Sequence, residues 1–220
     1  FVVTAGDNRY GSINFDLAVG RDYCPFIKGA TSGTNCGGNA ASVNAFFPVP
    51  GNHDYTDGGG LTEYLSYFTL PGTGVSTSGT SGNERYYDVI QGPVHLFFLD
   101  SQGAITSSSD MTAQKNWLQA QLAASTAVWK IVIDHHAPYS SCSTHGSVAS
   151  MQWPYQSWGA DAMFSGHDHT YERIVRYGFP YFVNGYGGYT LYNFGTVVDS
   201  SKVRYNSTYG AVRVDASRHT

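Results

Sequence analysis

The sequence predicts an α/β protein in which two mixed β-sheets pack as a sandwich and helices flank the sandwich. Three observations favour this fold class: short apolar runs recur along the chain, helical periodicity appears between some of them, and polar clusters follow directly after several runs. No internal repeat and no low-complexity linker divides the 220 residues. We therefore expect a single domain over residues 1–220.

The expected strands are apolar runs of a few residues, bounded mostly by Gly, Pro, Asn or Asp. They lie at residues 1–5, 46–50, 85–90, 94–99, 128–133, 160–164, 179–183 and 210–214. The strongest helix is predicted over residues 112–124, where apolar residues recur at helical spacing and Asp110 or Thr112 can cap the start. A second helix is expected over residues 61–68 and a short one over residues 16–19.

The composition is that of a globular protein, with 41% hydrophobic and 13% charged residues. The net charge is -4 and no cluster of Lys or Arg stands out, so the sequence carries no nucleic-acid footprint and none for an anionic membrane. No apolar run reaches the length of a membrane span, and the first residues lack the pattern of a signal peptide. Nothing in the sequence indicates an oligomeric state.

The three Cys residues bear on the compartment. Cys24 and Cys36 lie in one Gly-rich stretch and could pair across a short loop, which leaves Cys142 over. Together with few Lys and abundant Tyr, Ser and Thr, this favours a secreted or extracytoplasmic protein. Three reduced thiols in a cytosolic protein remain an open alternative.

Side chains of the kinds that bind metals follow four of the expected strands, and five of the eight His residues are among them. They are Asp7 and Tyr10, then Asn52, His53 and Asp54, then His135 and His136, and finally His167, Asp168 and His169. Ligands bind beyond the carboxyl ends of strands in open α/β sheets, so we expect these side chains to converge. Their mixture of nitrogen and oxygen suits Zn, Mn or Fe better than Ca or Mg.

These segments, in this order, resemble the motifs of calcineurin-like metallophosphoesterases. The residues that carry the resemblance are 6–10, 51–54, 132–135 and 166–169. The Tyr three residues after Asp7 makes the purple acid phosphatases the best match within that superfamily, and residues 171–173 and 184–188 also look like that group. The resemblance covers most of the chain and extends the expected fold to the αββα sandwich of that superfamily.

The resemblance implies a pair of metal ions, iron together with zinc, manganese or iron, with a hydroxide between them. Asp7 would bridge the two ions. Tyr10 and His169 would bind the first, expected to be Fe(III), and Asn52, His135 and His167 would bind the second.

The resemblance also implies the groups that act on the substrate. His53 would protonate the leaving-group oxygen, with Asp54 orienting it. Apart from the resemblance, we expect His136 to face the substrate or to support a ligand, and His145 to reach the substrate from its loop, with a solvated loop His as the alternative. The implied reaction is hydrolysis of a phosphomonoester on a small molecule or a phosphoprotein. A phosphodiesterase or nucleotide hydrolase of the same fold, and a non-catalytic extracellular protein that binds metal, are the alternatives.

One part of the family pattern has no counterpart in these residues. The family has an Asp at the end of an earlier strand that binds the first metal, and only six residues precede Asp7 here. We expect that the sequence begins partway into a longer protein, so that the first strand of the domain is missing from it. A reduced variant with a weakened first site is the other interpretation.

Overall fold

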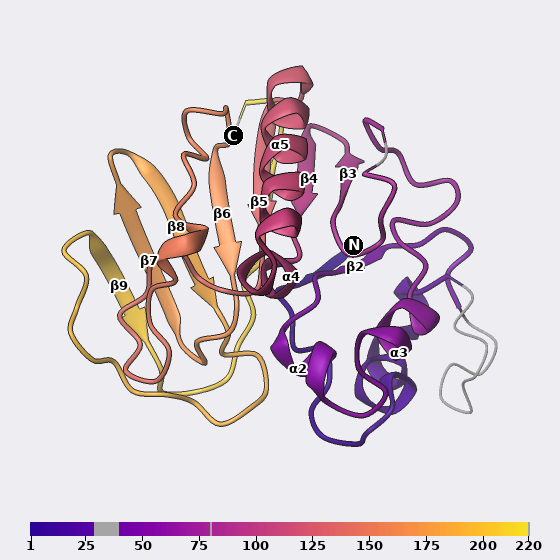
Figure 1. Ribbon diagram of the computed structural model, residues 1–220, viewed down its shortest axis with the longest axis horizontal. Helices are drawn as coiled ribbons and strands as arrows, with labels where there is room; N and C mark the ends of the chain where they lie inside the picture. Colours follow the sequence, from indigo (N-terminus) through magenta and orange to yellow (C-terminus); the bar gives the residue numbers. More distant parts are fainter. Residues whose placement is uncertain (29–39, 80, 220) are drawn as a thin grey trace.

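The computed structural model describes residues 1–28, 40–79 and 81–219, and within them it has the mixed α/β fold that the sequence predicts (Figure 1). Seven strands form a mixed sheet in the spatial order β3-β4-β5-β6-β8-β7-β9, and two parallel strands form a second sheet. The larger sheet contains β3 (Tyr87–Gln91), β4 (Val94–Phe98), β5 (Trp129–Ile133), β6 (Ala162–Ser165), β7 (Tyr171–Arg176), β8 (Phe179–Asn184) and β9 (Ser201–Tyr205), and the smaller one contains β1 (Val2–Thr4) and β2 (Phe46–Pro48).

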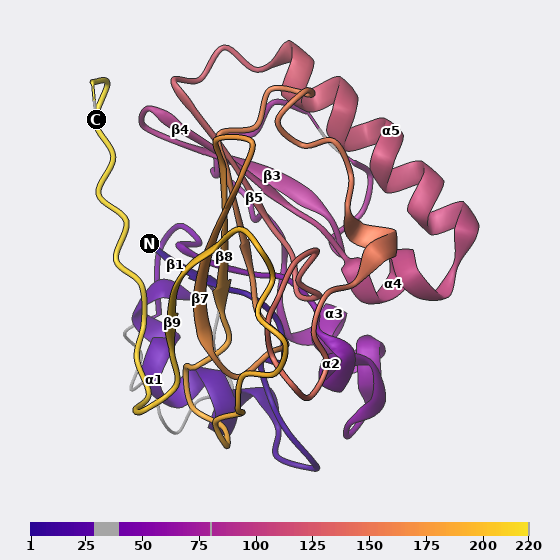
Figure 2. The ribbon, with the colours of Figure 1, turned by 90° about the vertical axis from the view of Figure 1, so that its left-hand side faces the viewer.

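The helices lie around these sheets, and α5 (Ser108–Ala124) is the longest of those described. The others are α1 (Arg21–Tyr23), α2 (Asn52–Thr56), α3 (Gly60–Tyr67), α4 (Ser101–Thr106), the π-helical turn Asp16–Gly20 and the 3₁₀ turns Cys24–Phe26 and Ala149–Met151. Figure 2 shows α5 along one face of the larger sheet and β1 on the opposite side. Among the described residues, no helix has the length and apolar character that crossing a membrane requires.

Alternation along the central strands gives the larger sheet two buried faces. In β4, Leu96 and Phe98 pack into the core that contains Phe47 of β2, whereas Phe97 packs into the core that contains Leu118 of α5. Successive side chains of a strand point to opposite faces, so one apolar run serves both layers. Full burial of each such side chain stabilises the fold by ~1.5–3 kcal/mol.

Parallel pairing decides where the strand ends lie. The strands β4, β5, β6 and β8 are neighbours that pair in parallel, and β1 pairs in parallel with β2. The carboxyl ends of the four parallel strands of the larger sheet therefore meet at one edge. The predicted ligands His135 and His167 follow two of these ends, those of β5 and β6.

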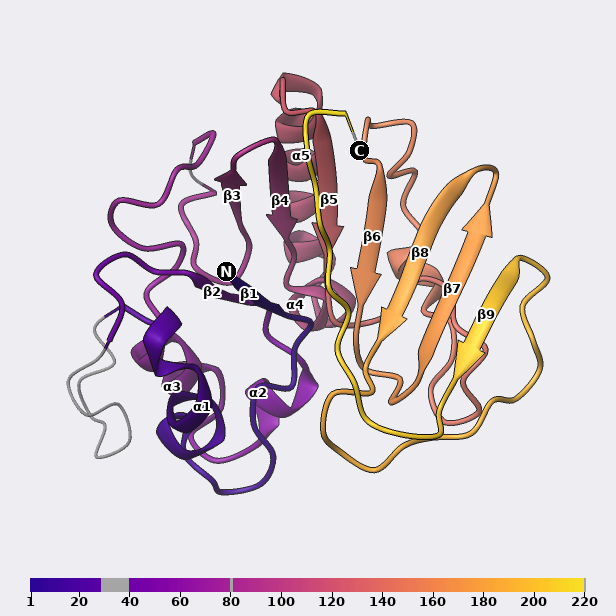
Figure 3. The ribbon, with the colours of Figure 1, turned by 180° about the vertical axis from the view of Figure 1, so that it is seen from behind.

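The structure differs from the predicted elements in several places. The strand expected at residues 210–214 is wrong: this segment has no ladder partner in the described chain, and Val214 is 54% exposed. It runs instead as extended chain over the face of the larger sheet that also carries β1 (Figure 3). The sequence does not predict β7 and β9, whose charged and polar residues obscure the strand pattern, nor the short helices α2 and α4.

Two further expectations concern capping and cysteines. The helix α5 begins at Ser108, and its cap is Ser107, whose Oγ accepts a hydrogen bond from the Asp110 backbone N–H. Asp110 and Thr112 are therefore inside the helix and do not cap it. The expected pair of Cys24 and Cys36 involves Cys36, which lies outside the described residues. Within the described chain, Cys142 is a buried free thiol.

Candidate metal centre

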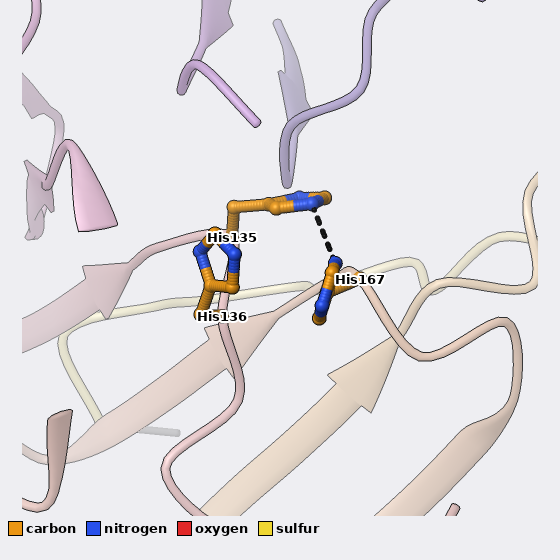
Figure 4. A group of neighbouring side chains, drawn as sticks. All are labelled: His135, His136 and His167. Atoms are coloured by element: carbon orange, nitrogen blue, oxygen red, sulfur yellow. Dashed lines mark hydrogen bonds between the residues drawn. The ribbon is translucent and has the colours of Figure 1, made fainter. Parts of the chain in front are cut away.

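The ends of four strands bring the predicted ligands together. Asp7 follows β1, Asn52 begins α2 after β2, His135 follows β5 and His167 follows β6. The side chains of His135, His136 and His167 face one another, and one nitrogen of each lies within 4.8 Å of the others (Figure 4). Residues from four separate parts of the sequence thus form one cluster.

A first group of donor atoms surrounds Nε2 of His135. Nδ1 of His135 donates a hydrogen bond to the Ala5 carbonyl oxygen at 2.7 Å, so Nε2 carries the lone pair of the neutral ring. Asn52 Oδ1 lies 3.0 Å from this nitrogen, His167 Nδ1 3.1 Å and Asp7 Oδ1 3.3 Å. Ligand atoms bound at ~2.1 Å in a tetrahedral site lie roughly 3.4 Å apart, which is close to these separations. The three separations from His135 Nε2 thus match those expected between ligands of a zinc-sized cation.

A second group of donor atoms lies on the other side of Asp7. Nδ1 of His169 donates to the Thr190 carbonyl oxygen at 2.7 Å, which leaves the lone pair on Nε2. That Nε2 is 3.0 Å from the Tyr10 hydroxyl, and the hydroxyl is 3.2 Å from Asp7 Oδ2. One oxygen of Asp7 therefore belongs to the first group and the other to the second, as a bridging carboxylate requires.

Backbone conformation at these residues is unusual. Asp7 has φ 52° and His167 has φ 63°, in the left-handed region that costs a residue with a Cβ ~1–3 kcal/mol. The glycines before the ligands have a steric role, since a Cβ at Gly6 would collide with the His135 ring and one at Gly51 with Asp7 Oδ1. Such strain is typical of sites where the fold holds side chains for a function.

Burial keeps the imidazoles of His136, His167 and His169 neutral, whereas at His135 the Asp7 carboxylate outweighs burial and raises the pKa of the ring. Burial, reinforced by the neighbouring imidazoles, lowers the pKa of His167 to about 2 and that of His136 to about 3. Burial also lowers the pKa of His169. Burial acts to raise the pKa of Asp7, but the charge and hydrogen bond of His135 outweigh it and hold that pKa well below its usual range. Neutral imidazoles and an ionised carboxylate are the forms that bind metals.

His53 lies beside the donor groups. Its ring centroid is 4.4 Å from that of Tyr10, and its Nδ1 is 2.8 Å from Oδ2 of Asp57, the residue that directly follows α2. The backbone N–H of His53 donates to Asp7 Oδ1 at 2.9 Å, which ties the start of α2 to the bridging carboxylate. His53 is thus the general-acid candidate that the sequence predicts, with the Asp57 carboxylate at Nδ1.

The expectation that Asp54 orients His53 is wrong. The Asp54 carboxylate accepts hydrogen bonds from the backbone N–H groups of Gly51 and Asn8 and from the Asn8 side chain. It has no solvent exposure, and burial raises its pKa to about 6. Asp54 therefore fastens the start of α2 to the loop after β1, and Asp57 takes the position beside His53.

His145 reaches the site from a loop. Its ring stacks on that of His167 with centroids 4.0 Å apart. Asp168 accepts a hydrogen bond from a backbone N–H of this loop, and buried Glu172 accepts two from Ser141, through the backbone N–H and the hydroxyl. The Asp and Glu of the sequence motif around the last ligands thus hold the loop that carries His145.

Several residues of the site escape sequence reasoning. Tyr189 stacks on Tyr10 with centroids 4.2 Å apart, and Tyr192 stacks on His169 at 4.1 Å. With 17 Tyr in the chain, nothing distinguishes these two in advance. Asp57 could have been found from its spacing of four residues after His53, given a helix there.

Comparisons with known proteins agree with this fold. A purple acid phosphatase from yellow lupin (Lupinus luteus) seeds superposes with a TM-score of 0.58 at 17% identity, covering 75% of this chain and 35% of that one. GAP50, the anchor in the inner membrane complex of Plasmodium, superposes with a TM-score of 0.54 at 19% identity, covering 73% and 55%. At these identities the two structures show that the fold is shared.

The sequence comparisons define the family. The profile of the calcineurin-like phosphoesterases matches residues 1–171. Purple acid phosphatase 15 of Arabidopsis thaliana is 30% identical over 149 residues, which are 63% of this chain and 27% of that protein. The chain belongs to the calcineurin-like phosphoesterase family, and its curated relatives, of whose length it spans less than a third, are purple acid phosphatases.

Proposed function

We propose that this chain hydrolyses phosphate monoesters with two metal ions held on either side of Asp7. The observation that carries the proposal is the pair of donor groups, each of which contains one oxygen of the Asp7 carboxylate. The similarity to purple acid phosphatases supports monoesters as the substrate class. The substrates would be phosphorylated small molecules or phosphoproteins.

The residues divide between the two ions as follows. Asn52, His135 and His167 would hold one ion, and Tyr10 and His169 the other. Mixed nitrogen and oxygen donors suit iron, zinc and manganese, and we propose iron beside Tyr10 with zinc, manganese or iron opposite. When bound, such a pair polarises the phosphoryl group, makes water a stronger nucleophile and holds the two in line.

His53 is placed to assist the leaving group. When the bond from phosphorus to the leaving oxygen breaks, its electron pair moves onto that oxygen, and a proton from His53 converts the alkoxide to an alcohol. Asp57, 2.8 Å from Nδ1, fixes the orientation of the ring for this transfer. General-acid assistance of this kind contributes typically ~10²–10⁴-fold to the rate.

Hydrolysis of 4-nitrophenyl phosphate and of bis(4-nitrophenyl) phosphate tests the proposal. We expect the metal-loaded protein to prefer the monoester, and we expect removal of metal or His167→Ala to lower the rate by at least about a hundredfold. The exposed His219 gives the control, since His219→Ala should change nothing. A preference for the diester would favour a phosphodiesterase, and metal binding without hydrolysis of either would favour a non-catalytic protein.

A further inference from the structure

His136 sits among the proposed ligands without an assigned partner in the reaction. Its side chain is 4% exposed, and its ring centroid lies 4.4 Å from that of His167 and 4.9 Å from that of His135. By position alone, it could be a third imidazole ligand beside the other two. What distinguishes it is the group that holds its ring.

That group is the hydroxyl of Ser101, the first residue of α4, which has no solvent exposure. The backbone N–H groups of His135 and His136 both donate to Ser101 Oγ, at 3.2 and 2.9 Å, and Nδ1 of His136 is 2.9 Å from the same oxygen. A hydroxyl has two acceptor lone pairs and one proton. The two backbone N–H groups occupy the lone pairs, so the hydroxyl donates its proton to Nδ1.

We propose that Ser101 is a positioning residue that fixes the proton of neutral His136 on Nε2, so that His136 donates a hydrogen bond to an oxygen of the phosphoryl substrate and does not bind metal. A nitrogen that carries a proton has no lone pair for a cation. Among the described residues nothing hydrogen-bonds to Nε2, so its N–H is available to a ligand. The part of the proposal that names the phosphoryl oxygen rests on the proposed function.

The neighbouring histidines show the opposite arrangement. Nδ1 of His135 and of His169 each face a backbone carbonyl oxygen, those of Ala5 and Thr190. A carbonyl only accepts, so in these rings Nδ1 holds the proton and Nε2 the lone pair. For His135, His136 and His169, the group at Nδ1 therefore decides whether Nε2 carries a lone pair or a proton. A buried N–H aimed at a phosphate makes a charge-assisted hydrogen bond, the stronger kind.

The proton position can be measured without any activity. Long-range ¹H–¹⁵N correlation spectra of the ¹⁵N-labelled, metal-free protein near neutral pH distinguish the two imidazole tautomers, and the signal missing from His136→Gln assigns His136. We expect the Nε2–H form in the wild type and a shift toward the Nδ1–H form in Ser101→Ala. The Nδ1–H form in the wild type, or a folded Ser101→Ala with an unchanged tautomer, would overturn the proposal.

Metal content and inhibition by inorganic phosphate give a second test that does not need Ser101→Ala to fold. A Gln side chain places an N–H donor near the position of Nε2, so His136→Gln should keep the metal content and bind phosphate within about threefold of the wild type. His136→Ala should keep the metal and bind phosphate about tenfold more weakly or worse. Loss of a metal ion in His136→Ala would make His136 a ligand and overturn the proposal. A wild type that binds neither metal nor phosphate would refute the proposed function, and the tautomer would then decide the role of Ser101 alone.

Discussion

At the scale of single residues, the partner of each side chain decides its chemistry. Asp54 lies in α2 and Asp57 directly follows that helix, three residues later, yet their surroundings differ. Asp54 accepts hydrogen bonds from backbone groups and is fully buried, whereas Asp57 Oδ2 is beside the ring of His53 and accepts only the Gly11 N–H from the backbone. The sequence alone cannot tell which of the two carboxylates orients His53. The contacts assign a structural role to Asp54 and favour Asp57 as the positioning residue.

These roles predict opposite effects for two matched substitutions. Asp57→Asn should lower turnover by about tenfold or more, because the carboxylate that orients His53 is gone, with little change in stability, because the new amide oxygen can still accept from the Gly11 N–H. Asp54→Asn should lower the free energy of unfolding by about 1–3 kcal/mol, because the new amide cannot accept all of the buried hydrogen bonds. Turnover per folded molecule and urea denaturation separate the two, with His53→Ala, expected to lose roughly a hundredfold, as the reference. A large loss of turnover in stable Asp54→Asn, with little in Asp57→Asn, would restore Asp54 as the orienting group.

The sequence predicts some of the site residues, and there is a physical reason why it can. Asp7, His135 and His167 are chemically distinctive and follow apolar runs, and strand ends must meet at a sheet edge. Ser101 has no such signal, because Ser is common and only the folded chain brings its hydroxyl to two backbone N–H groups and a ring. The role of Asp57 depends on α2, a helix too short for apolar periodicity to reveal.

At the scale of elements, the end of β5 holds another buried carboxylate, that of Asp134, directly before His135, which we propose as a ligand. Asp134 has no solvent exposure, and its Oδ1 accepts a hydrogen bond from Ser165 at the end of β6, at 2.6 Å. Its Oδ2 has no hydrogen-bond partner in the described chain. Burial raises the pKa of Asp134 to about 8. The ends of β5 and β6 are therefore joined through a carboxyl group that favours its protonated form.

This raised pKa predicts a pH dependence of stability. Between about pH 4 and pH 8 the native metal-free protein holds a proton on Asp134 that the unfolded chain has released, so stability falls as pH rises through this window. Asp134→Asn removes the ionisation and should unfold with a free energy roughly 4 kcal/mol above that of the wild type at pH 7, and about equal to it near pH 4. Urea denaturation at several pH values measures this, with exposed Asp215→Asn as the control. A difference that does not grow with pH would contradict the role of Asp134.

The sequence predicts the strands that are apolar and misses those that are polar. The strands β4 and β5 are continuous apolar runs because both of their faces are buried. The sequence of β9 is polar because most of it is exposed at an edge, and it therefore resembles a loop. Residues 210–214 alternate in the manner of a strand but meet no partner strand, and alternation within a segment cannot report whether a partner exists.

At the scale of the whole molecule, the two sheets bring distant parts of the chain to one centre. The smaller sheet supplies Asp7 and Asn52 from the first quarter of the chain, and the larger supplies the imidazoles after β5 and β6. The two donor groups differ in size. Asp7 Oδ1 shares its group with Asn52, His135 and His167, whereas Asp7 Oδ2 shares its group only with Tyr10 and His169 among the described residues.

Titration of the metal-free chain with Zn²⁺, followed by calorimetry, tests the central claim that Asp7 joins two metal sites. We predict two binding events, the tighter one lost in His135→Ala and the weaker one lost in His169→Ala, because four donors hold a cation better than three. Asp7→Ala should weaken both events by about tenfold or more, since each donor group loses one oxygen. A single binding event, or two events of which Asp7→Ala leaves one unchanged, would contradict the account.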